Sequence, residues 1–437
     1  LAAIAQIAEG RSTDRNGDPQ PRPKYAYIIR SLKRPEEVTA FRRVYRPGFY
    51  LVGVFATEEE RRAYLVDDKG TDPIRADAIL ERDQQETSDD YGQRTRDTFH
   101  RSDVFVQLKG NLYKKEIKRF LDLVFGHPFI TPTPDEYAMF LAAAAASRSS
   151  QWGRQVGAAI MNSNRDVVAL GCNEVPRAGG GSYWEDQFGT FRDHEQDPPR
   201  DSNDEAKKEI AEDILTGIGE CLKTVYEKTQ QELGKDTVQK FRSYMEAGLP
   251  MSASLFKQTK LFDITEFGRA THAEMDALLG CARSGINPQS ANLYTTTFPC
   301  HNCTRHIIAA GIKRVVYIEP YPKSKATDLH GDAIKLGVDS DTQTSGDAGE
   351  FKIPFVPFVG VGPRRFLDLF SMELSSGYVL ERKRNGQMVA WNEASNRGPR
   401  VSMLAASYLD REEGAVRDIN ELLKQAEGAD ASDKKDV

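Results

Sequence analysis

Cysteine is scarce in this sequence, with five residues in a chain of 437, and the spacings between them are irregular. A small, odd number without a repeated spacing argues against a disulfide scaffold and favours a reducing compartment. Long apolar runs are also missing. The longest candidate, "MFLAAAAASRSS", is interrupted by Ser147 and Arg148 and falls short of the roughly 20 residues that a membrane span needs. No signal peptide is visible. We therefore expect a cytoplasmic protein that does not cross a membrane.

An excess of positive charge is the next thing that the sequence lacks. The formal net charge is −6 and the pI is near 5.8. This balance gives no support to a broad nucleic-acid-binding surface, although it leaves room for local basic pockets. The length favours two domains over a single core. The chain begins with Leu1 instead of Met, so its first residue need not be the N-terminus.

The first 128 residues have the pattern of an α/β domain. Runs rich in β-branched and aromatic residues predict three strands, in "YAYIIRSL" (25–32), "FYLVGVFA" (49–56) and "SDVFVQLKG" (102–110). Helical periodicity from Pro35 onward predicts a helix between the first two strands. The charged stretch 79–101 predicts a helix or a lid. Because strands alternate with helices, we expect a parallel sheet.

A Pro-rich stretch, "HPFITPTPDEYAM" (127–139), predicts a domain boundary. Thr133 and Pro134 open a helix with a cap, a proline at the first position and early acids. The segment "QVGAAIMNSNRDVVALGCNE" (155–174) predicts a β-hairpin. Residues 177 to about 262 differ, with a polar loop and then a charged amphipathic helix pair, and we interpret them as an insertion.

Helices and strands alternate after the insertion. We expect helices at 273–284 and 301–310, and strands at 293–297, at 314–318 and within 351–361. Gly285 and Gly311 each follow a helix end, where left-handed caps are common. The tail after about Ser375 predicts one helix, 412–425, and ends in a charged disordered run.

Soft metal ligands gather in two short motifs, "HAE" (272–274) and "PCHNC" (299–303). A catalytic zinc site uses three protein ligands and one open position, and His272, Cys300 and Cys303 supply three. Both motifs fall at expected helix starts, where the helix dipole favours thiolate over thiol. We therefore predict a Zn²⁺ site.

Glu274 lies two residues after His272, within reach of the site without binding the metal. Zinc lowers the pKa of a bound water towards neutrality, and a nearby carboxylate can then move protons as a general acid–base group. The alternative is a structural zinc knuckle. We expect Cys172, Cys221 and Cys281 to be small buried apolar residues. The remaining histidines of interest are His301 and His306, expected near a helix surface, and His194, which belongs to a solvated loop or to a second metal site.

Substrate-binding candidates come from three segments. Asn173, in "GCNEVPR", offers both a donor and an acceptor to a sugar hydroxyl, or forms an ordinary turn. Phosphate-binding candidates lie where loops follow helices and strands: Arg148, Ser149, Ser150, Lys323 and Ser324, with Arg154 and Arg177 as weaker candidates. Surface charge without a ligand is the alternative for each.

From about Pro134 to Phe370, without the insertion, the chain resembles the deoxycytidylate deaminases of the cytidine deaminase superfamily. The segments that carry the resemblance are "SRSSQWGRQVGAAI", "GCNEVPR", "HAEMDALL" and "YTTTFPCHNCTRHIIAAGIKRVVYIEPYPKS". The His-x-Glu and Pro-Cys-x-x-Cys motifs are typical of zinc-dependent base deaminases. The resemblance implies that His272, Cys300 and Cys303 bind zinc, that Glu274 moves protons, and that Asn173 binds the sugar.

A narrower resemblance covers the whole chain. "YAYIIRSLKRPEEV", "EPYPKS" and "FVGVGPRRF" resemble bacterial anti-phage dCTP deaminases, in which a P-loop-kinase-like domain precedes the deaminase. This implies an α/β fold: an incomplete P-loop-kinase-like parallel-sheet domain (1–128), then a three-layer α/β/α deaminase domain (129–374) with a mixed five-stranded sheet and the helical insertion. Residues 375–437 form an extension. The phosphate-binding Gly-x-x-x-x-Gly-Lys-Ser/Thr motif does not occur, so it precedes Leu1 or has been lost.

The expected function is zinc-dependent hydrolytic deamination of free deoxycytidine nucleotides, dCTP or dCMP, which would deplete dCTP during phage infection. The resemblance also implies a homo-oligomer and a small inhibitory non-coding RNA. One alternative is a polynucleotide cytidine deaminase, which would need a basic groove lined by aromatic residues. Another is a zinc-stabilised RNA-binding sensor that does not require turnover.

Overall fold

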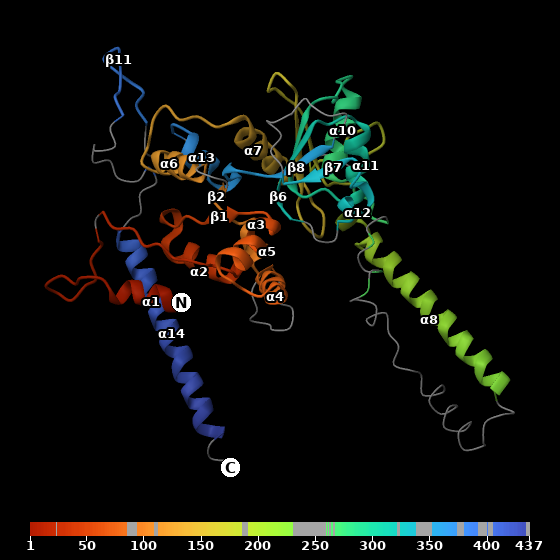
Figure 1. Cartoon of the computed structure of the whole chain (residues 1–437), viewed down its shortest axis with the longest axis horizontal. Coiled ribbons are helices and arrows are strands. Elements are labelled where there is room, and N and C mark those ends of the chain that lie inside the picture. The colour runs from red at the N-terminus through yellow and green to blue at the C-terminus, as the bar shows by residue number, and fades with distance from the viewer. Residues whose placement is uncertain are drawn as a thin grey trace.

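The structure is a computed structural model of the whole chain (Figure 1). It describes residues 1–433 except for the following positions: 23, 85–93, 109–111, 186–190, 230–258, 260, 262–263, 265–266, 321–323, 338–351, 374–379, 392–399 and 401–404.

A six-stranded mixed sheet forms the centre of the second half of the chain. Its order is β4-β3-β5-β6-β8-β7, with strands β3 (Gly157–Met161), β4 (Val167–Cys172), β5 (Asn292–Thr297), β6 (Arg314–Glu319), β7 (Ile334–Leu336) and β8 (Ile353–Pro357). The hairpin β3–β4 and the pair β3–β5 are antiparallel, and the rest are parallel. The expectation of five strands was wrong, because the short edge strand β7 joins the sheet.

Helices cover both faces of this sheet. On one face lie α10 (Ala273–Arg283) and α11 (His301–Ala309); their apolar residues share a buried cluster with Leu293 and Phe355. On the other face lies α7 (Pro134–Ala146), packed with Tyr294 and Val356. The expected cap of α7 is confirmed, because the Thr133 hydroxyl accepts a hydrogen bond from the amide of Glu136. Gly285 and Gly311 have positive φ angles of 67° and 72°, as expected.

A smaller sheet, of order β1-β2-β9, belongs mainly to the first half of the chain. Strands β1 (Val52–Phe55) and β2 (Val104–Gln107) are parallel, as predicted, whereas β9 (Gly360–Val361) comes from far along the chain and is antiparallel to β2. The strand predicted at 25–32 was wrong. The described backbone there has no strand, and the Ile28 side chain is 89% exposed. A favourable composition without a neighbouring strand to pair with does not form a sheet.

Six α-helices accompany the smaller sheet within the described part of the first half of the chain. They are α1 (Ala2–Glu9), α2 (Pro35–Tyr45), α3 (Glu58–Ala63), α4 (Pro73–Gln84), α5 (Thr95–Phe99) and α6 (Leu112–Val124). Of these, α6 packs against β2 and β9. The helix predicted from Pro35 is α2, and the charged stretch 79–101 contributes to α4 and α5. Shorter elements are α12 (Ala326–His330), α13 (Phe366–Phe370), β10 (Lys383–Arg384) and β11 (Gln387–Met388).

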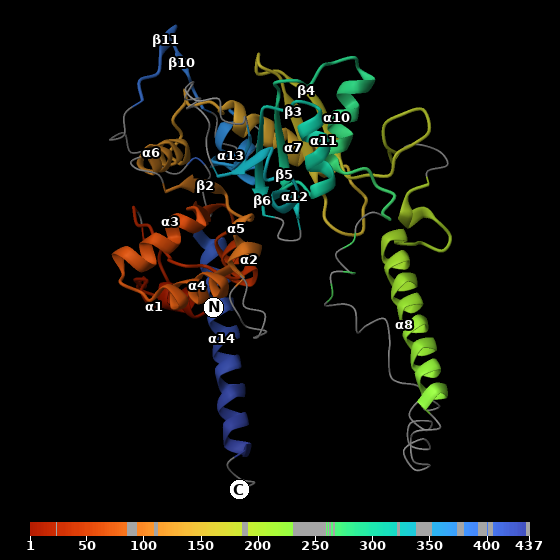
Figure 2. The ribbon, with the colours of Figure 1, turned by 45° about the vertical axis from the view of Figure 1, so that its right-hand side comes forward.

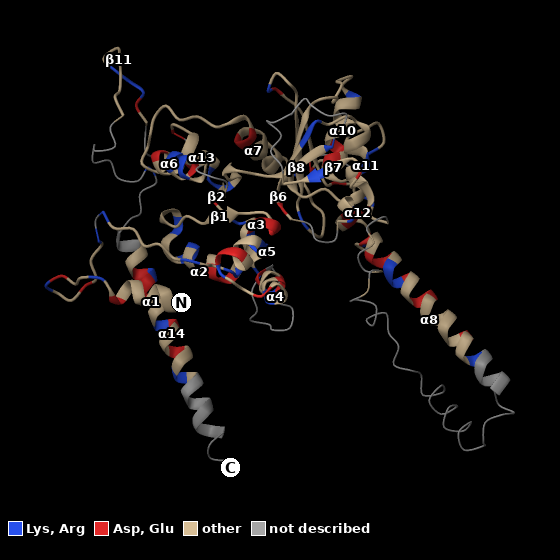
Figure 3. Cartoon of the chain, viewed as in Figure 1, with Lys and Arg blue, Asp and Glu red and all other residues tan. Residues whose placement is uncertain are grey.

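Two long helices extend beyond the sheets (Figures 1 and 2). The insertion contains α8 (Ser202–Thr229), along which acidic and basic residues are interspersed (Figure 3). The helix pair expected in this part of the insertion was wrong as far as the structure describes it. Residues 202–229 form one continuous helix, and the residues that follow directly lie outside the described part of the chain. In the tail, α14 (Ala405–Asp433) is longer than the predicted helix 412–425 and packs against α1 and α2. Of the helices described, none combines the length and apolar character needed to cross a membrane.

Candidate metal centre

Two helix starts place the three predicted metal ligands together. His272 is the N-cap residue of α10, and Cys300 is the N-cap residue of α11. Their donor atoms, with the Sγ of Cys303, all lie within 4.8 Å of one another. The Nδ1 of His272 is 3.3 Å from the Cys300 sulfur and 3.4 Å from the Cys303 sulfur. One imidazole nitrogen and two sulfurs at this spacing form a donor set of the kind that zinc prefers.

The local backbone explains why these side chains converge. Strand β4 ends at Cys172, and two residues later Glu174 pairs with Thr271 in an isolated antiparallel bridge. That bridge holds the chain immediately before His272. Strand β5 ends at Thr297, three residues before Cys300. The carboxyl ends of β4 and β5 therefore lie next to the starts of the two ligand-bearing helices, which is where α/β folds usually build their sites.

The two cysteine thiols have different acidities. The hydrogen bond that they share lowers the pKa of the Cys300 thiol, and the His272 imidazole acts in the same direction. The same hydrogen bond, together with burial, raises the pKa of the Cys303 thiol. The amide of Cys303 also donates to the Cys300 sulfur at 3.4 Å, as expected at the start of a helix. The donors at the helix start and the His272 imidazole therefore favour a thiolate at Cys300.

Glu274 lies beside this cluster and is 4% exposed. Burial raises the pKa of its carboxyl group. The hydroxyl of Thr295 lies 3.4 Å from Glu274 Oε1. A buried carboxylate with a raised pKa next to a metal donor set can both accept and return a proton.

Asn173 is close to this region, but its side chain contacts the backbone. Its Oδ1 accepts from the amide of Val156 at 2.7 Å, and its Nδ2 donates to the carbonyl of Arg154 at 2.8 Å. Each contact leaves the amide a further lone pair or proton. The structure thus places Asn173 directly after β4 and beside the start of β3, where it holds the segment that leads into β3.

The serines predicted to contact phosphate have structural partners. Ser149 donates to the carbonyl of Asn173 at 2.6 Å, and Ser150 donates to the carboxylate of Glu174 at 2.8 Å. Ser324 donates to the carbonyl of Pro299 at 2.8 Å. These hydroxyls hold loops against the site. Lys323 lies outside the described residues.

Arg148 differs from its neighbours because its guanidinium group has donors to spare. It stacks on Trp184, with 3.8 Å between the guanidinium carbon and the ring centre. Its Nε and Nη2 are buried and have no hydrogen-bond partner among the described residues. The weaker candidates are engaged: Arg154 pairs with Glu319, and Arg177 bonds the carbonyl of Gly180 within its own turn.

Sequence reasoning missed Glu174, which is fully buried. Its carboxylate accepts from the amide and hydroxyl of Ser150 and from the amide of Val175. Glu174 thereby ties the loop after α7 to the chain that leads into His272. The sequence signal that could have revealed this role is an acidic residue directly after Asn173, at the end of a predicted strand.

Other sequence expectations have mixed outcomes. Cys172 and Cys281 are buried as expected, but Cys221 is exposed on α8, so that prediction was wrong. His306 is exposed on α11. His194 lies 3.8 Å from Glu195 in a short turn. It does not belong to the His–Cys–Cys group, the one metal-compatible cluster among the residues that the structure describes.

Comparison with known proteins identifies the region around this cluster. Residues 132–319 match the model of the cytidine and deoxycytidylate deaminase zinc-binding region. This part of the chain is therefore similar to the zinc-binding region of cytidine and deoxycytidylate deaminases. All three clustered ligands and Glu274 lie within the matched residues, and the donor set fits the zinc that the family's description names.

Individual relatives match over a shorter stretch. ComE operon protein 2 of Bacillus subtilis is 47% identical over 53 residues, which are 12% of this chain and 28% of that protein. The deoxycytidylate deaminase of Enterobacteria phage T4 is 44% identical over 54 residues, again 12% and 28%. This chain thus spans under a third of the length of these relatives. Among solved structures, the apo dCMP deaminase of cyanophage S-TIM5 aligns with 52% of this chain and 100% of its own, at 15% identity and a TM-score of 0.25.

Proposed function

We propose that this protein is a zinc-dependent deaminase that hydrolyses the exocyclic amine of free deoxycytidine nucleotides. The observation that carries the proposal is the convergence of His272, Cys300 and Cys303 beside the buried Glu274, inside the deaminase-type region. Three ligands leave one coordination position open, which is typical of catalytic rather than structural zinc.

The chemistry follows from the residues present. Bound zinc would supply an acidified water molecule as the nucleophile. Glu274 would accept a proton from the attacking water and deliver it to the ring nitrogen. It would then take the second proton of that water from the hydroxyl group added to the ring carbon and deliver it to the departing amine. The carbon–nitrogen bond breaks, an oxygen replaces the amine, and ammonia leaves. The raised pKa of Glu274 suits a group that must both hold and release a proton.

Nucleotide recognition is proposed for a small set of side chains. Arg148 is the strongest phosphate candidate, since two of its buried donors have no hydrogen-bond partner among the described residues. Asn173 remains the candidate for a sugar hydroxyl. Ser149, Ser150 and Ser324 would act mainly by positioning loops, through the backbone and carboxylate contacts described above.

The finer parts of the proposal rest on the resemblance of the quoted segments. They are activity on dCTP as well as dCMP, depletion of dCTP as a defence against phage, assembly into a homo-oligomer, control by a small non-coding RNA, and a P-loop-kinase-like character for residues 1–128. The division into residues 1–128, 129–374 and 375–437 is likewise a proposal.

Product analysis tests the activity directly. The zinc-loaded protein is incubated separately with dCMP, dCTP and single-stranded DNA, and the products are identified by mass and by released ammonia. We expect dCMP or dCTP to be converted to the uracil nucleotide. Conversion of single-stranded DNA alone would favour a polynucleotide deaminase.

Two variants separate catalysis from zinc binding. Glu274→Gln should keep its zinc and lose turnover by about 10²–10⁴-fold, the usual contribution of a general acid–base group. Cys300→Ser should lose both zinc and turnover. If Glu274→Gln kept full biological activity, the result would favour a sensor that does not require turnover over an enzyme. A fully active Cys300→Ser protein would overturn the ligand assignment.

A further inference from the structure

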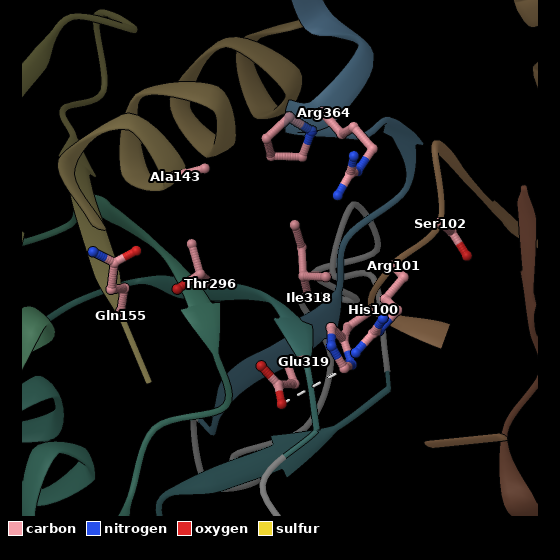
Figure 4. A pocket seen from close by; sticks show the side chains of 10 residues that line it. His100, Arg101, Ser102, Ala143, Gln155, Thr296, Ile318, Glu319 and Arg364 are labelled. Atoms are coloured by element: carbon pink, nitrogen blue, oxygen red, sulfur yellow. Dashed lines mark ion pairs between the residues drawn. The ribbon is translucent and has the colours of Figure 1, made fainter. Parts of the chain in front are cut away.

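A cavity of about 380 Å³ lies where the two halves of the chain meet (Figure 4). His100 and Arg101 come from the turn between α5 and β2. Thr296 and Glu319 come from the carboxyl ends of β5 and β6, and Arg364 follows β9. The volume falls in the range of small-molecule sites. Residues from position 100 to position 364 of the chain build its wall.

The cavity is separate from the metal cluster. Ile318 lines it and packs in the apolar cluster of the α7 face, whereas Cys300 and Cys303 belong to the cluster on the opposite face. Successive residues of a strand point to opposite faces. Thr295 therefore faces Glu274, while Thr296 faces the cavity and accepts a hydrogen bond from the amide of Gly157.

Positive charge is in excess around this space. Within the described part of the chain, the guanidinium groups of Arg101 and Arg364 form no ion pair or hydrogen bond, and both residues are exposed. Glu319 is the acidic residue in the described lining. It already pairs with Arg154 and lies 4.0 Å from His100.

A further arginine lies behind Arg364. Burial lowers the pKa of Arg42, and the neighbouring charges of Arg364 and Arg365 also lower it, against the effect of Asp103. Asp103 pairs with Arg42 at 3.0 Å and with Arg365 at 3.5 Å. The charges of Arg101 and Arg364 have no such acidic partner among the described residues, and a bound anion would stabilise them.

We propose that this cavity binds the phosphate chain of a phosphorylated small molecule, held by Arg101 and Arg364 with His100 beside them. A guanidinium group offers paired donors that match two phosphate oxygens. Gln155 and Thr296 add polar groups to the opposite wall. In Figure 4, Arg364 approaches the space from one side and His100 and Arg101 from another. Such a ligand would hold the first half of the chain against the deaminase-type sheet.

Two sources could supply these phosphates. One is the deoxycytidine nucleotide itself, an option that rests on the proposed function. Gln155 lies between the two residues whose backbone groups Asn173 binds, so the cavity begins next to the candidate sugar-binding side chain. The other source is a separate phosphorylated molecule.

Calorimetric titration with inorganic tripolyphosphate, added as its magnesium complex to the zinc-loaded full chain, tests the site without a nucleotide. We expect saturable binding that weakens with salt. Arg101→Gln and Arg364→Gln should each weaken it about tenfold or more, since charged hydrogen bonds are lost. Arg417→Gln removes an exposed arginine from α14, away from the cavity, and should change nothing.

The absence of binding to the wild-type protein, or equal affinity in all four proteins, would overturn the proposal. Thermal melting confirms that each variant is folded, and the two cavity variants are independent of each other. Tripolyphosphate titration reports on the cavity even if no deamination is found, so the two proposals can fail separately.

Steady-state kinetics identify the source of the phosphates. If they belong to the substrate, Arg364→Gln should raise the KM for dCTP about tenfold and leave that for dCMP unchanged. If they belong to another molecule, both KM values should stay at the wild-type level while tripolyphosphate binding is lost.

Discussion

Thr295 is fully buried, with its hydroxyl group between the Thr297 carbonyl and the Glu274 carboxylate. The hydroxyl donates to the carbonyl of Thr297 at 3.0 Å and lies 3.4 Å from the Glu274 carboxylate. Among the described residues, the hydroxyl forms no hydrogen bond with His272, Cys300 or Cys303. Thr295 is therefore a positioning residue, which restricts where the carboxylate can lie between one proton transfer and the next.

Thr295→Val should lower kcat about fivefold, the equivalent of one neutral hydrogen bond of roughly 1 kcal/mol. Zinc content, measured by atomic absorption, should stay at the wild-type level because no ligand is changed. Thr295→Ser keeps the hydroxyl and should restore most of the rate. A valine variant as fast as the wild-type protein would show that this hydroxyl does not position Glu274.

Cysteine reactivity should follow burial. Cys221 is exposed, whereas Cys172 and Cys281 are buried. Burial raises the pKa of the Cys172 thiol to about 11 and also raises that of Cys281. At pH 8 these two thiols are almost entirely protonated, and only the thiolate reacts readily with alkylating reagents.

Iodoacetamide at pH 8 should therefore modify Cys221 well before Cys172 or Cys281, as peptide mass spectrometry would show. Cys221→Ser should remove the fast phase and leave the slow one. Equal rates at the three positions would contradict the buried placement of Cys172 and Cys281.

Among the helices and strands, two glycines set how closely the layers approach. A Cβ on Gly171 of β4 would lie 2.2 Å from the carbonyl oxygen of Ala273 and 2.5 Å from the amide of Ala277. Both contacts are with the backbone of α10, which cannot move aside as a flexible side chain could. Gly157 of β3 meets α7 in the same way. Glycine at position 171 therefore fixes the distance from the sheet to the helix that begins at His272.

Gly171→Ala should lower the free energy of unfolding by about 1–3 kcal/mol, the usual cost of overpacking. It should also weaken zinc binding, because α10 must shift away from the cysteines of α11. Gly280 lies on α10, the helix that Gly171 faces, and a Cβ there would meet only ordinary contacts at 3.6–3.7 Å. Gly280→Ala is therefore the matched control. It should stabilise the protein slightly, since alanine favours a helix. Unfolding by urea and competition for zinc by a chelator measure both effects.

How well the elements could be predicted depended on whether their signals are local. The cap at Thr133, the hairpin of β3 and β4, and the helices after His272 and Cys300 have sequence signals within a few residues, and the predicted bounds agree closely with the structure. The metal cluster could be predicted for the same reason, because its ligands lie at the starts of those helices. The strand at 25–32 failed because a strand needs a distant partner.

The same limit applies to the substrate candidates. The sequence supplied Asn173, Ser149 and Ser150 as polar groups near the site, but it could not show that they bind backbone and carboxylate groups of their neighbours. The cavity at Arg101 and Arg364 was also beyond prediction, because residues far apart in the sequence form it.

At the scale of the whole molecule, the two ends of the chain are joined. Arg11 follows α1, and Glu412 lies on α14; their side chains are 5% and 2% exposed. The guanidinium group binds both carboxylate oxygens, at 2.5 and 2.6 Å, and lies 5.1 Å from the ring centre of Tyr408. Ala415 extends the contact by packing in one cluster with Ile4. The tail thus forms part of the core of the first half of the chain.

A buried ion pair is a poor source of stability by itself, but it is costly to break. Glu412→Gln leaves the Arg11 charge buried without a counter-charge, so we expect a loss of about 3–5 kcal/mol in the free energy of unfolding of this part of the chain. Arg11→Met should cost a similar amount. The double variant Arg11→Met/Glu412→Leu leaves no uncompensated charge, and should therefore be more stable than either single variant.

The exposed pair of Arg384 and Glu381, with side chains 66% and 48% exposed, is the matched control. Glu381→Gln should cost less than about 1 kcal/mol, because water screens that pair. Urea unfolding of the full chain, followed by the fluorescence of its aromatic residues and by hydrogen exchange in α1 and α14, measures each change. Single-variant losses that simply add in the double variant would mean that Arg11 and Glu412 are not coupled, and that apolar packing alone holds α14 to α1.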